Sequence, residues 1–245
     1  MNRRKLLRLS LALNLAFILL GTIYLIRKIE FWTTHSVKAQ RTVQSAGPPT
    51  EGDFVSTPEY RWQEGLFEEE PIQNGAVVFL GDSITAGGFW QYVWRGKAQQ
   101  PILNRGLACD TMEGVIARID EVMRHRPRKI FIMIGINDLR FQDDKPGDLL
   151  NQYKILLHKI DERQPEAQIY LQSLLPVWGE TNKAVEEVNQ GMSKLDDGKR
   201  VHYLDIHYLV TDSKGELGRE WTFDGIHIRA AAYQKWRDSV WPLVN

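Results

Sequence analysis

Four short polar motifs in the sequence hold the residue types that an acyl transfer requires. They are Gly-Asp-Ser-Ile-Thr at 81–85, Asn-Arg-Gly at 104–106, Gly-Ile-Asn-Asp at 135–138 and Asp-Gly-Ile-His at 224–227. An acyl transfer needs a hydroxyl nucleophile, a base that takes its proton, a group that orients the base, and donors for the developing oxyanion. Each motif alone has ordinary turn composition, but together they supply every one of these parts.

The residue types within the motifs suggest a role for each. Ser83 is the candidate nucleophile, His227 the candidate base and Asp224 the carboxylate that orients the base. The three-residue spacing allows Asp224 and His227 to come from one turn. We expect the oxyanion to be held by the backbone N–H groups of Ser83 and Gly106 and by the side-chain amide of Asn137. Glycine at 106 would let the substrate approach the backbone closely.

Other interpretations of these residues stay open at this point. Ser83 alone could cap a helix, and His207, two residues after an aspartate, is the main rival base. Asp82 and Asp138 are expected to hydrogen-bond loop amides. The glycine-containing loop 81–88 leaves a flavodoxin-like cofactor binder as an alternative. The sequence contains no HExxH, GxxxxGK[ST] or GxSxG motif, so it predicts neither a metal nor a cofactor, and argues against an α/β-hydrolase.

The motifs follow short apolar runs that alternate with amphipathic stretches. Strands are predicted at 76–80, 102–104, 129–134, 168–175 and 201–206, and helices at 111–124, 148–163, 182–195 and 229–241. Strands that alternate with helices form a parallel sheet covered on both faces. We therefore predict a three-layer, flavodoxin-like α/β fold with about five strands, whose ligands bind at the carboxyl ends of the strands.

Local signals predict two helix starts and one packing contact. Thr57 can cap a helix that has Pro58 at its first position. Asp110 and Glu113 form a plausible capping pair for the helix at 111–124. Trp90 and Trp94 are spaced by one helical turn, which favours packing between a helix and the sheet over contact with a ligand.

The four motifs, in this order, resemble the sequence blocks of the SGNH hydrolases, also called GDSL esterases and lipases. The resemblance runs from about Tyr60 to Trp236. It implies the roles given above for Ser83, Gly106, Asn137, Asp224 and His227. The stretch RGLACDTMEGVIARIDEV is similar to the group of platelet-activating-factor acetylhydrolase subunits, which implies a short-acyl ester as substrate.

The chain departs from this family pattern beside the predicted site. Cys109 stands where many relatives have glycine, and Arg229 and Ala232 follow the histidine where asparagine and glycine are frequent. Trp178 and Trp221 lie in segments that approach the catalytic loop. We expect Cys109 and these two tryptophans to form the substrate rim, with packing as the alternative role for the tryptophans.

The sequence as a whole predicts a serine esterase that hydrolyses an acetyl or other short acyl ester, with a glycan as one candidate carrier. A lysophospholipase or other lipid esterase is the alternative, and so is a glycan- or lipid-binding domain without turnover. No sequence feature assigns an oligomeric state. The first 41 residues carry eight basic residues and one acidic residue, so the remainder holds 30 acidic against 23 basic residues. An acidic body of this kind is not expected to bind nucleic acid.

The amino-terminal end predicts a membrane anchor. After a basic segment at 1–8, residues 9–26 carry no charge and reach about 27 Å as a helix, close to the thickness of a bilayer core. Residues 27–57 are predicted to be a tether and 58–245 the hydrolase domain. The excess of positive charge before the anchor places the domain outside the cytoplasm. Secretion after signal-peptide cleavage is the alternative.

Overall fold

The computed structural model describes residues 57–142 and 144–245, which all belong to one compact unit, Glu51–Asn245. The predicted anchor at 9–26 and nearly all of the predicted tether lie outside the described residues. Within those residues no helix combines the length and the apolar character that crossing a membrane would need.

Five parallel strands form the sheet of the described region. They are β1 (Val77–Gly81), β2 (Ile102–Gly106), β3 (Lys129–Met133), β4 (Gln168–Gln172) and β5 (Val201–Leu204). Their spatial order is β2-β1-β3-β4-β5, and every neighbouring pair is parallel. The predicted three-layer α/β architecture with about five parallel strands is therefore confirmed for this part of the chain.

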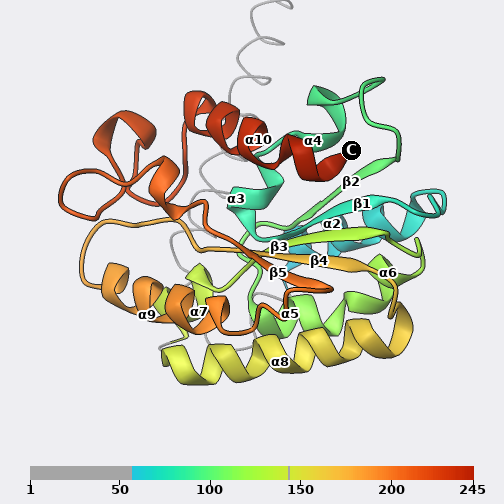
Figure 1. Cartoon of the computed structure of the whole chain (residues 1–245), viewed down its shortest axis with the longest axis horizontal. Coiled ribbons are helices and arrows are strands. Elements are labelled where there is room, and N and C mark those ends of the chain that lie inside the picture. Colours follow the sequence, from blue (N-terminus) through green and yellow to red (C-terminus); the bar gives the residue numbers. More distant parts are fainter. Residues whose placement is uncertain (1–56, 143) are drawn as a thin grey trace, which may run out of the picture. The chain divides into compact units, whose positions relative to one another are not determined.

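Helices cover both faces of the sheet (Figure 1). One face carries α3 (Ser83–Ala86), α4 (Trp90–Val93) and α10 (Ala230–Val244). The other carries α5 (Met112–Ala117), α6 (Ile119–Met123), α7 (Ile136–Phe141), α8 (Pro146–Arg163) and α9 (Thr181–Ser193). Helix α2 (Pro58–Glu69) precedes the first strand, and two 3₁₀ turns, η2 (His207–Leu209) and η3 (Arg219–Trp221), follow the last.

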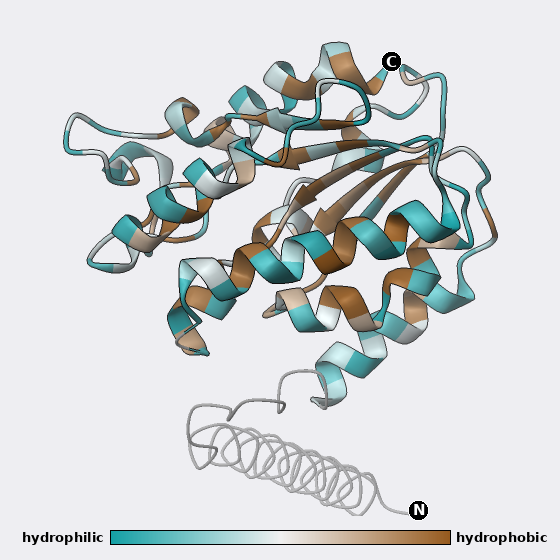
Figure 2. Ribbon diagram, turned by 60° about the horizontal axis from the view of Figure 1, so that its bottom comes forward, coloured by the Kyte–Doolittle hydropathy of each residue, from teal (hydrophilic) through white to brown (hydrophobic). Residues whose placement is uncertain are grey.

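Burial explains why these segments adopt strands and helices. Every residue of β1 is buried, as expected for a central parallel strand enclosed by helices on both faces. Helix α8 instead buries one stripe, Leu149, Tyr153, Leu156 and Ile160, at the spacing of an amphipathic helix. Figure 2 shows the same contrast, with hydrophobic residues along the strands and mixed colours on the surrounding helices.

The predicted tryptophan packing and the first helix cap are both confirmed. The Trp90 ring stacks on Phe79 of β1 at 4.1 Å between centroids, and Trp94 lies 5.8 Å from the same ring. Both indoles are nearly inaccessible to solvent. Thr57 caps α2, because its side chain accepts a hydrogen bond from the N–H of Tyr60 at 3.2 Å.

The predicted helix at 111–124 is wrong in two respects. Thr111, rather than Asp110, caps its start by accepting from the N–H of Gly114 at 3.3 Å. The segment also divides into α5 and α6 at Arg118, whose φ of −96° and ψ of 9° leave the α-helical region. The Arg118 side chain is buried and bonds to Asp110 and to two strand carbonyls, so tertiary contacts outweigh helical continuity here.

Candidate active site

The strand order places the candidate site at the carboxyl end of β1. The chain leaves β1 for β2 on one side of the sheet and later adds β3 on the other, which makes this the switch point where α/β folds bind ligands. Gly81 at the end of β1 is in register with Gly106 of β2 and Met133 of β3. The residues that follow these three strands, Ser83, Cys109 and Asn137, therefore start from one edge.

Ser83, His227 and Asp224 form a continuous chain of hydrogen bonds. The Oγ of Ser83 lies 2.9 Å from Nε2 of His227, and Nδ1 of the same ring lies 2.7 Å from Oδ2 of Asp224. Both distances are those of a nucleophile–base pair oriented by a carboxylate. The side chains of His227 and Asp224 are each about half exposed, so the histidine end of this series of hydrogen bonds is open to solvent.

Local hydrogen bonds hold the loop that carries the histidine. Oδ1 of Asp224 accepts from the N–H groups of Ile226 and His227 at 3.0 and 2.8 Å. The Thr222 hydroxyl accepts from the Gly225 N–H at 2.9 Å and donates to the His227 carbonyl at 2.7 Å. Although partial burial opposes ionisation, the hydrogen bonds from His227 and from these N–H groups lower the pKa of Asp224 to about 2. Asp224 is therefore an anion at neutral pH.

His207, the rival base, lies in a different environment. Its Nδ1 is 2.9 Å from the carbonyl oxygen of Leu174 and 3.3 Å from the side-chain amide of Asn189. These contacts tie the ring to the end of β4 and to α9. The structure thus brings His227, and not His207, into contact with Ser83.

Asn137 and Ser83, the other two predicted oxyanion donors, each keep a hydrogen-bond donor that no described residue occupies. Nδ2 of Asn137 donates one of its two hydrogens to the carbonyl of Asp110 at 2.8 Å, which fixes the amide and leaves the second hydrogen for another acceptor. The backbone N–H of Ser83, at the first position of α3, has no protein partner in the described part of the chain. Both groups can therefore donate to a substrate oxygen.

Gly106 was predicted to serve in the oxyanion hole, and the structure shows which contacts it makes instead. Its N–H already donates to Oδ1 of Asn104 at 3.0 Å. A Cβ at this position would come within 2.1 Å of the backbone nitrogen of Ala86. Glycine is therefore required here for the close packing of β2 against α3, and this steric need explains the residue without any contact to substrate.

Cys109 has a backbone conformation that favours glycine. Its φ of 62° lies in the left-handed region, which a cysteine rarely occupies, and its side chain is exposed. No described residue accepts a hydrogen bond from its N–H. The next residue supplies the carbonyl that holds Asn137, so the Cys109 N–H and the Asn137 amide belong to neighbouring parts of the site. Although the side chain is exposed, its partial removal from water raises the pKa of the Cys109 thiol, and the nearby Asp82 carboxylate adds to this shift.

A buried ion pair holds the loop at 107–111 in place. Nε of Arg118 lies 2.8 Å from Oδ2 of Asp110, and both side chains are about 1% exposed. Nη2 of Arg118 also donates to the carbonyls of Gly81 and Arg105, at 3.3 and 2.7 Å. One side chain thus connects the loop at 107–111 to the ends of β1 and β2. Sequence reasoning missed this role, because a helix-forming arginine carries no signal that it points inward.

Asp82 and Asp138 have the structural roles that were expected. Oδ1 of Asp82 accepts from the Ile84 N–H at 2.9 Å, and Oδ1 of Asp138 accepts from the Met112 N–H at 2.9 Å. Burial is the main reason that the pKa of each carboxyl is raised to about 7. Asp138 thereby ties α7, which carries Asn137, to the start of α5.

The two predicted rim tryptophans flank the histidine loop. Trp178 covers Gly225, where a Cβ would lie 2.6 Å from the indole, and the backbone N–H of Trp178 donates to the Gly225 carbonyl at 3.1 Å. The Trp221 ring carries Lys235 Nζ 4.2 Å from its centroid. Phe223, which the sequence reasoning did not single out, is 80% exposed beside Asp224 and has the Arg229 guanidinium 3.8 Å from its ring centroid. Trp178 therefore supports the loop, and Phe223 presents an aromatic surface next to the triad.

The chain is similar in sequence or in fold to several known proteins. Over 166 residues the chain is 26% identical to platelet-activating factor acetylhydrolase IB subunit alpha1 from Pongo abelii, which covers 64% of this chain and 70% of that protein. A structure from Streptococcus pneumonia, provisionally described as a platelet activating factor, has a TM-score of 0.68 at 22% identity and covers 85% of this chain and 99% of its own. A variant of an acetyl-xylooligosaccharide esterase from Geobacillus Stearmophilus has a TM-score of 0.58 at 18% identity, covering 72% and 97%.

The two structural matches show a shared fold, and the family assignment comes from the sequence. The model of the GDSL-like Lipase/Acylhydrolase family matches residues 79–235, which is more than half of the chain and includes all four motifs. The protein therefore belongs to the GDSL-like lipase/acylhydrolase family and is a carboxylic ester hydrolase.

Proposed function

We propose that the protein is a serine esterase that removes an acetyl or other short acyl group from an alcohol. The observation that carries this proposal is the hydrogen-bonded chain from Ser83 Oγ through His227 to Asp224, at 2.9 and 2.7 Å. In this chain the hydroxyl is already in contact with the nitrogen that would take its proton.

The reaction proceeds in two halves through an acyl-enzyme. Nε2 of His227 takes the hydroxyl proton as Ser83 Oγ bonds to the ester carbonyl carbon, and the imidazolium that forms is stabilised by Asp224. His227 then returns the proton to the leaving alkoxide as the ester C–O bond breaks. In the second half His227 takes a proton from water, the hydroxide attacks the acyl-serine, and the acid departs as Ser83 regains its proton.

The oxyanion of each tetrahedral intermediate needs donors that are free in the resting structure. The Ser83 N–H and the second Nδ2 hydrogen of Asn137 meet this condition, and so does the Cys109 N–H, whereas the Gly106 N–H is occupied by Asn104. We therefore assign Cys109 the position that Gly106 was predicted to hold. Preorganised donors of this kind each contribute about 10²–10³ in turnover.

A glycan is the alcohol that the surroundings of the triad favour. The half-exposed side chains of His227 and Asp224 leave room for a bulky alcohol on the leaving-group side. The exposed ring of Phe223 beside Asp224 provides a surface on which a sugar ring can pack. Similarity in name supports an acetyl group, since two of the matched proteins are an acetylhydrolase and an acetyl-xylooligosaccharide esterase.

A series of p-nitrophenyl esters from acetate to long-chain acids tests this function. We expect hydrolysis that decreases with acyl length and that falls by about 10⁴-fold or more in Ser83→Ala. Activity that rises with chain length would favour a lysophospholipase or lipid esterase instead. If neither the wild type nor Ser83→Ala hydrolysed any of the esters, the result would contradict esterase function for these substrates and favour a domain that binds glycan or lipid.

We also propose that residues 9–26 anchor the protein in a membrane with the hydrolase domain outside the cytoplasm. The support is the uncharged run itself and the larger number of basic residues before it than directly after it. The full-length chain is expected to remain in the membrane pellet after alkaline carbonate extraction. A shorter, soluble form that begins near Gln40 would indicate signal-peptide cleavage instead.

A further inference from the structure

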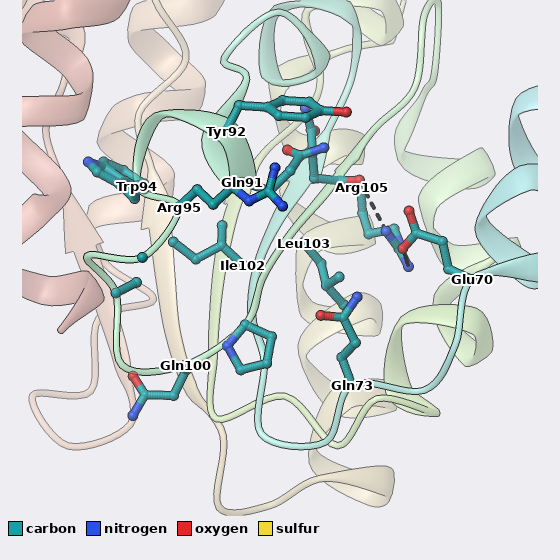
Figure 3. Close-up of a pocket in the computed structure, with 14 residues that line it drawn as sticks. Glu70, Gln73, Gln91, Tyr92, Trp94, Arg95, Gln100, Ile102, Leu103 and Arg105 are labelled. Carbon is teal, nitrogen blue, oxygen red and sulfur yellow. Dashed lines mark hydrogen bonds and ion pairs between the residues drawn. The ribbon is translucent and has the colours of Figure 1, made fainter.

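A polar groove lies along the free edge of the sheet, outside the triad. Its volume is about 390 Å³, within the size range of small-ligand sites. Strand β2 forms its floor through Ile102, Leu103 and Asn104, and the segment at 91–101 forms one wall (Figure 3). Ser83, Asp224 and His227 do not line it.

Helix α4 divides its side chains between the core and this groove. Trp90 and Trp94 face inward, where Trp90 stacks on Phe79 and donates from Nε1 to the carbonyl of Thr85 at 2.8 Å. This buried anchor leaves the remaining face of the turn toward the groove, where Gln91, Tyr92 and Arg95 lie in Figure 3. The wall is therefore rigidly held although its outer side chains are polar.

Two amide oxygens in the groove lining are buried without a partner. Oε1 of Gln91 and Oε1 of Gln100 accept no hydrogen bond in the described part of the protein. Buried acceptors are usually paired, so an unpaired one in the lining of a cavity is a candidate acceptor for a ligand. Each amide also has an NH₂ group, so Gln91 and Gln100 can accept from one hydroxyl and donate to the next.

The groove has almost no net charge. Arg105 is a buried cation in its wall, but Glu70 at 2.9 Å and Glu121 at 3.0 Å pair with it from two sides. Arg95 is the remaining charged side chain of the lining. This balance of charge does not suit a polyanion such as nucleic acid. The guanidinium of Arg95 can instead donate several hydrogen bonds to neutral oxygen atoms.

The free edge of β2 is poorly suited to receiving an added strand. Strand addition uses N–H and C=O groups of alternate residues along the edge. The Asn104 carbonyl accepts from Nη1 of Arg105 at 3.3 Å, and the Gly106 N–H is held by the Asn104 side chain. Among the even-numbered residues of β2, only Ile102 keeps both its N–H and its C=O out of these side-chain bonds. An added peptide strand would therefore meet an interrupted row of partners.

An exposed aromatic pair lies at the rim. Tyr92 lines the groove and is 65% exposed, and its ring centroid is 6.4 Å from that of Phe89, which is 61% exposed. Phe89 has a φ of 50°, a left-handed conformation that is strained for a bulky residue. Aromatic faces next to paired donors and acceptors match a sugar, whose C–H face is apolar and whose edge carries hydroxyls.

We propose that this groove is a second binding site, separate from the catalytic centre, for a neutral oligosaccharide. The amides of Gln91 and Gln100 and the guanidinium of Arg95 bind the sugar hydroxyls, and the Tyr92 ring packs against a sugar face. Such a site would hold a polymeric glycan on the protein while the triad acts elsewhere. The inference depends on the groove alone and does not require the proposed esterase function.

Binding of unesterified oligosaccharides to the full-length protein tests the proposal. Xylotetraose, cellotetraose and chitotetraose are titrated by calorimetry in a detergent that has no sugar head group. We expect one-to-one binding of at least one of them, weakened about tenfold by Arg95→Ala or Gln91→Ala, since each variant loses hydrogen bonds to the ligand. Tyr92→Ala should weaken binding as well, and because Tyr92 is exposed this variant tests the site without disturbing the core.

Control measurements separate this site from the triad and from other occupants. Tyr208→Ala removes an equally exposed tyrosine on η2 and should leave the affinity unchanged. Hydrolysis of p-nitrophenyl acetate should be the same in all four variants. Absence of binding by all three oligosaccharides overturns the proposal, and so does binding that Arg95→Ala and Tyr92→Ala leave intact. A change in oligomeric state of these variants would assign the groove to contact between copies of the chain instead.

Discussion

The serine side and the histidine side of the site are held in opposite ways. Around Ser83, the supporting groups Asp82, Asp110 and Asn137 are buried, and their partners come from three strands and their loops. Around His227, the side chains of His227 and Asp224 are half exposed, and most hydrogen bonds run within residues 222–227, with one more from the Trp178 backbone. The surroundings of Ser83 thus depend on the folded core, whereas His227 is positioned mainly by one short loop.

This comparison predicts different consequences for substitutions on each side. On the histidine side, loss of a polar group should reduce activity and leave the free energy of unfolding nearly unchanged, because exposed groups exchange protein partners for water. On the serine side, activity and stability should fall together, because buried partners would be left unpaired.

The largest effect is expected for Asp224→Asn on the exposed side. The amide can keep Oδ1 as acceptor for the loop N–H groups but no longer stabilises the imidazolium, so kcat should fall by about 10⁴-fold. Steady-state hydrolysis of p-nitrophenyl acetate and thermal unfolding measure both quantities. A loss of less than tenfold, or a clearly lower Tm, would contradict the division between the two sides.

Arg118→Met tests the buried side through stability. The substitution leaves the Asp110 carboxylate buried and unpaired, which should cost about 3–5 kcal/mol of unfolding free energy. Urea denaturation measures this loss, and the double variant Arg118→Met with Asp110→Asn should recover part of it by removing the orphaned charge. If the single variant loses under about 1 kcal/mol, the pair behaves like a surface ion pair and the comparison fails.

Asn137→Ala should reduce kcat by about 10²–10³-fold through loss of one oxyanion donor. It also removes the hydrogen bond to the Asp110 carbonyl, so the free energy of unfolding should decrease by about 1 kcal/mol. The activity loss should appear in kcat rather than KM, because the oxyanion forms only in the transition state. An unchanged kcat would remove Asn137 from the oxyanion hole.

The last prediction concerns the pH dependence of stability, which does not involve activity. Burial raises the pKa of Asp138 from 3.8 to about 7, so the folded protein retains a proton that the unfolded chain releases between these values. This contribution to stability is fully present below pH 3.8 and is lost as pH rises through about 7. Asp138→Asn cannot titrate, so its Tm should decline less than that of the wild type between pH 4 and 7. Asp238→Asn, at an exposed position, serves as the control and should follow the wild-type curve.

Residue types and local spacing were sufficient to predict the sheet and to single out Ser83, Asp224 and His227, which the structure brings into contact. Buried parallel strands are apolar runs, so β1, β3 and β4 could be located from hydrophobicity alone. The three-residue spacing of Asp224 and His227 is a local property, and the structure brings these two side chains together within one loop. Their contact with Ser83 spans 144 positions and was expected only because all the motifs follow strand ends.

The roles of Gly106, Cys109 and Arg118 depend on contacts between distant segments, so only the tertiary structure reveals them. Gly106 had the right residue type for an oxyanion donor, but the closeness of Ala86 and the side chain of Asn104 give it a packing role. Cys109 instead adopts the left-handed backbone, which its residue type does not predict. Arg118 interrupts a regular helical pattern because a buried carboxylate and two carbonyls bind it more strongly than one turn of helix does.

The sequence by itself thus determined the strands, the long helices and the residue types capable of acyl transfer, because these follow from apolar periodicity and side-chain chemistry. Only the tertiary structure decided which N–H groups remain free, which charges are buried, and where the groove on β2 lies. Those properties depend on distances between segments far apart in the chain, and local residue patterns carry no information about such distances.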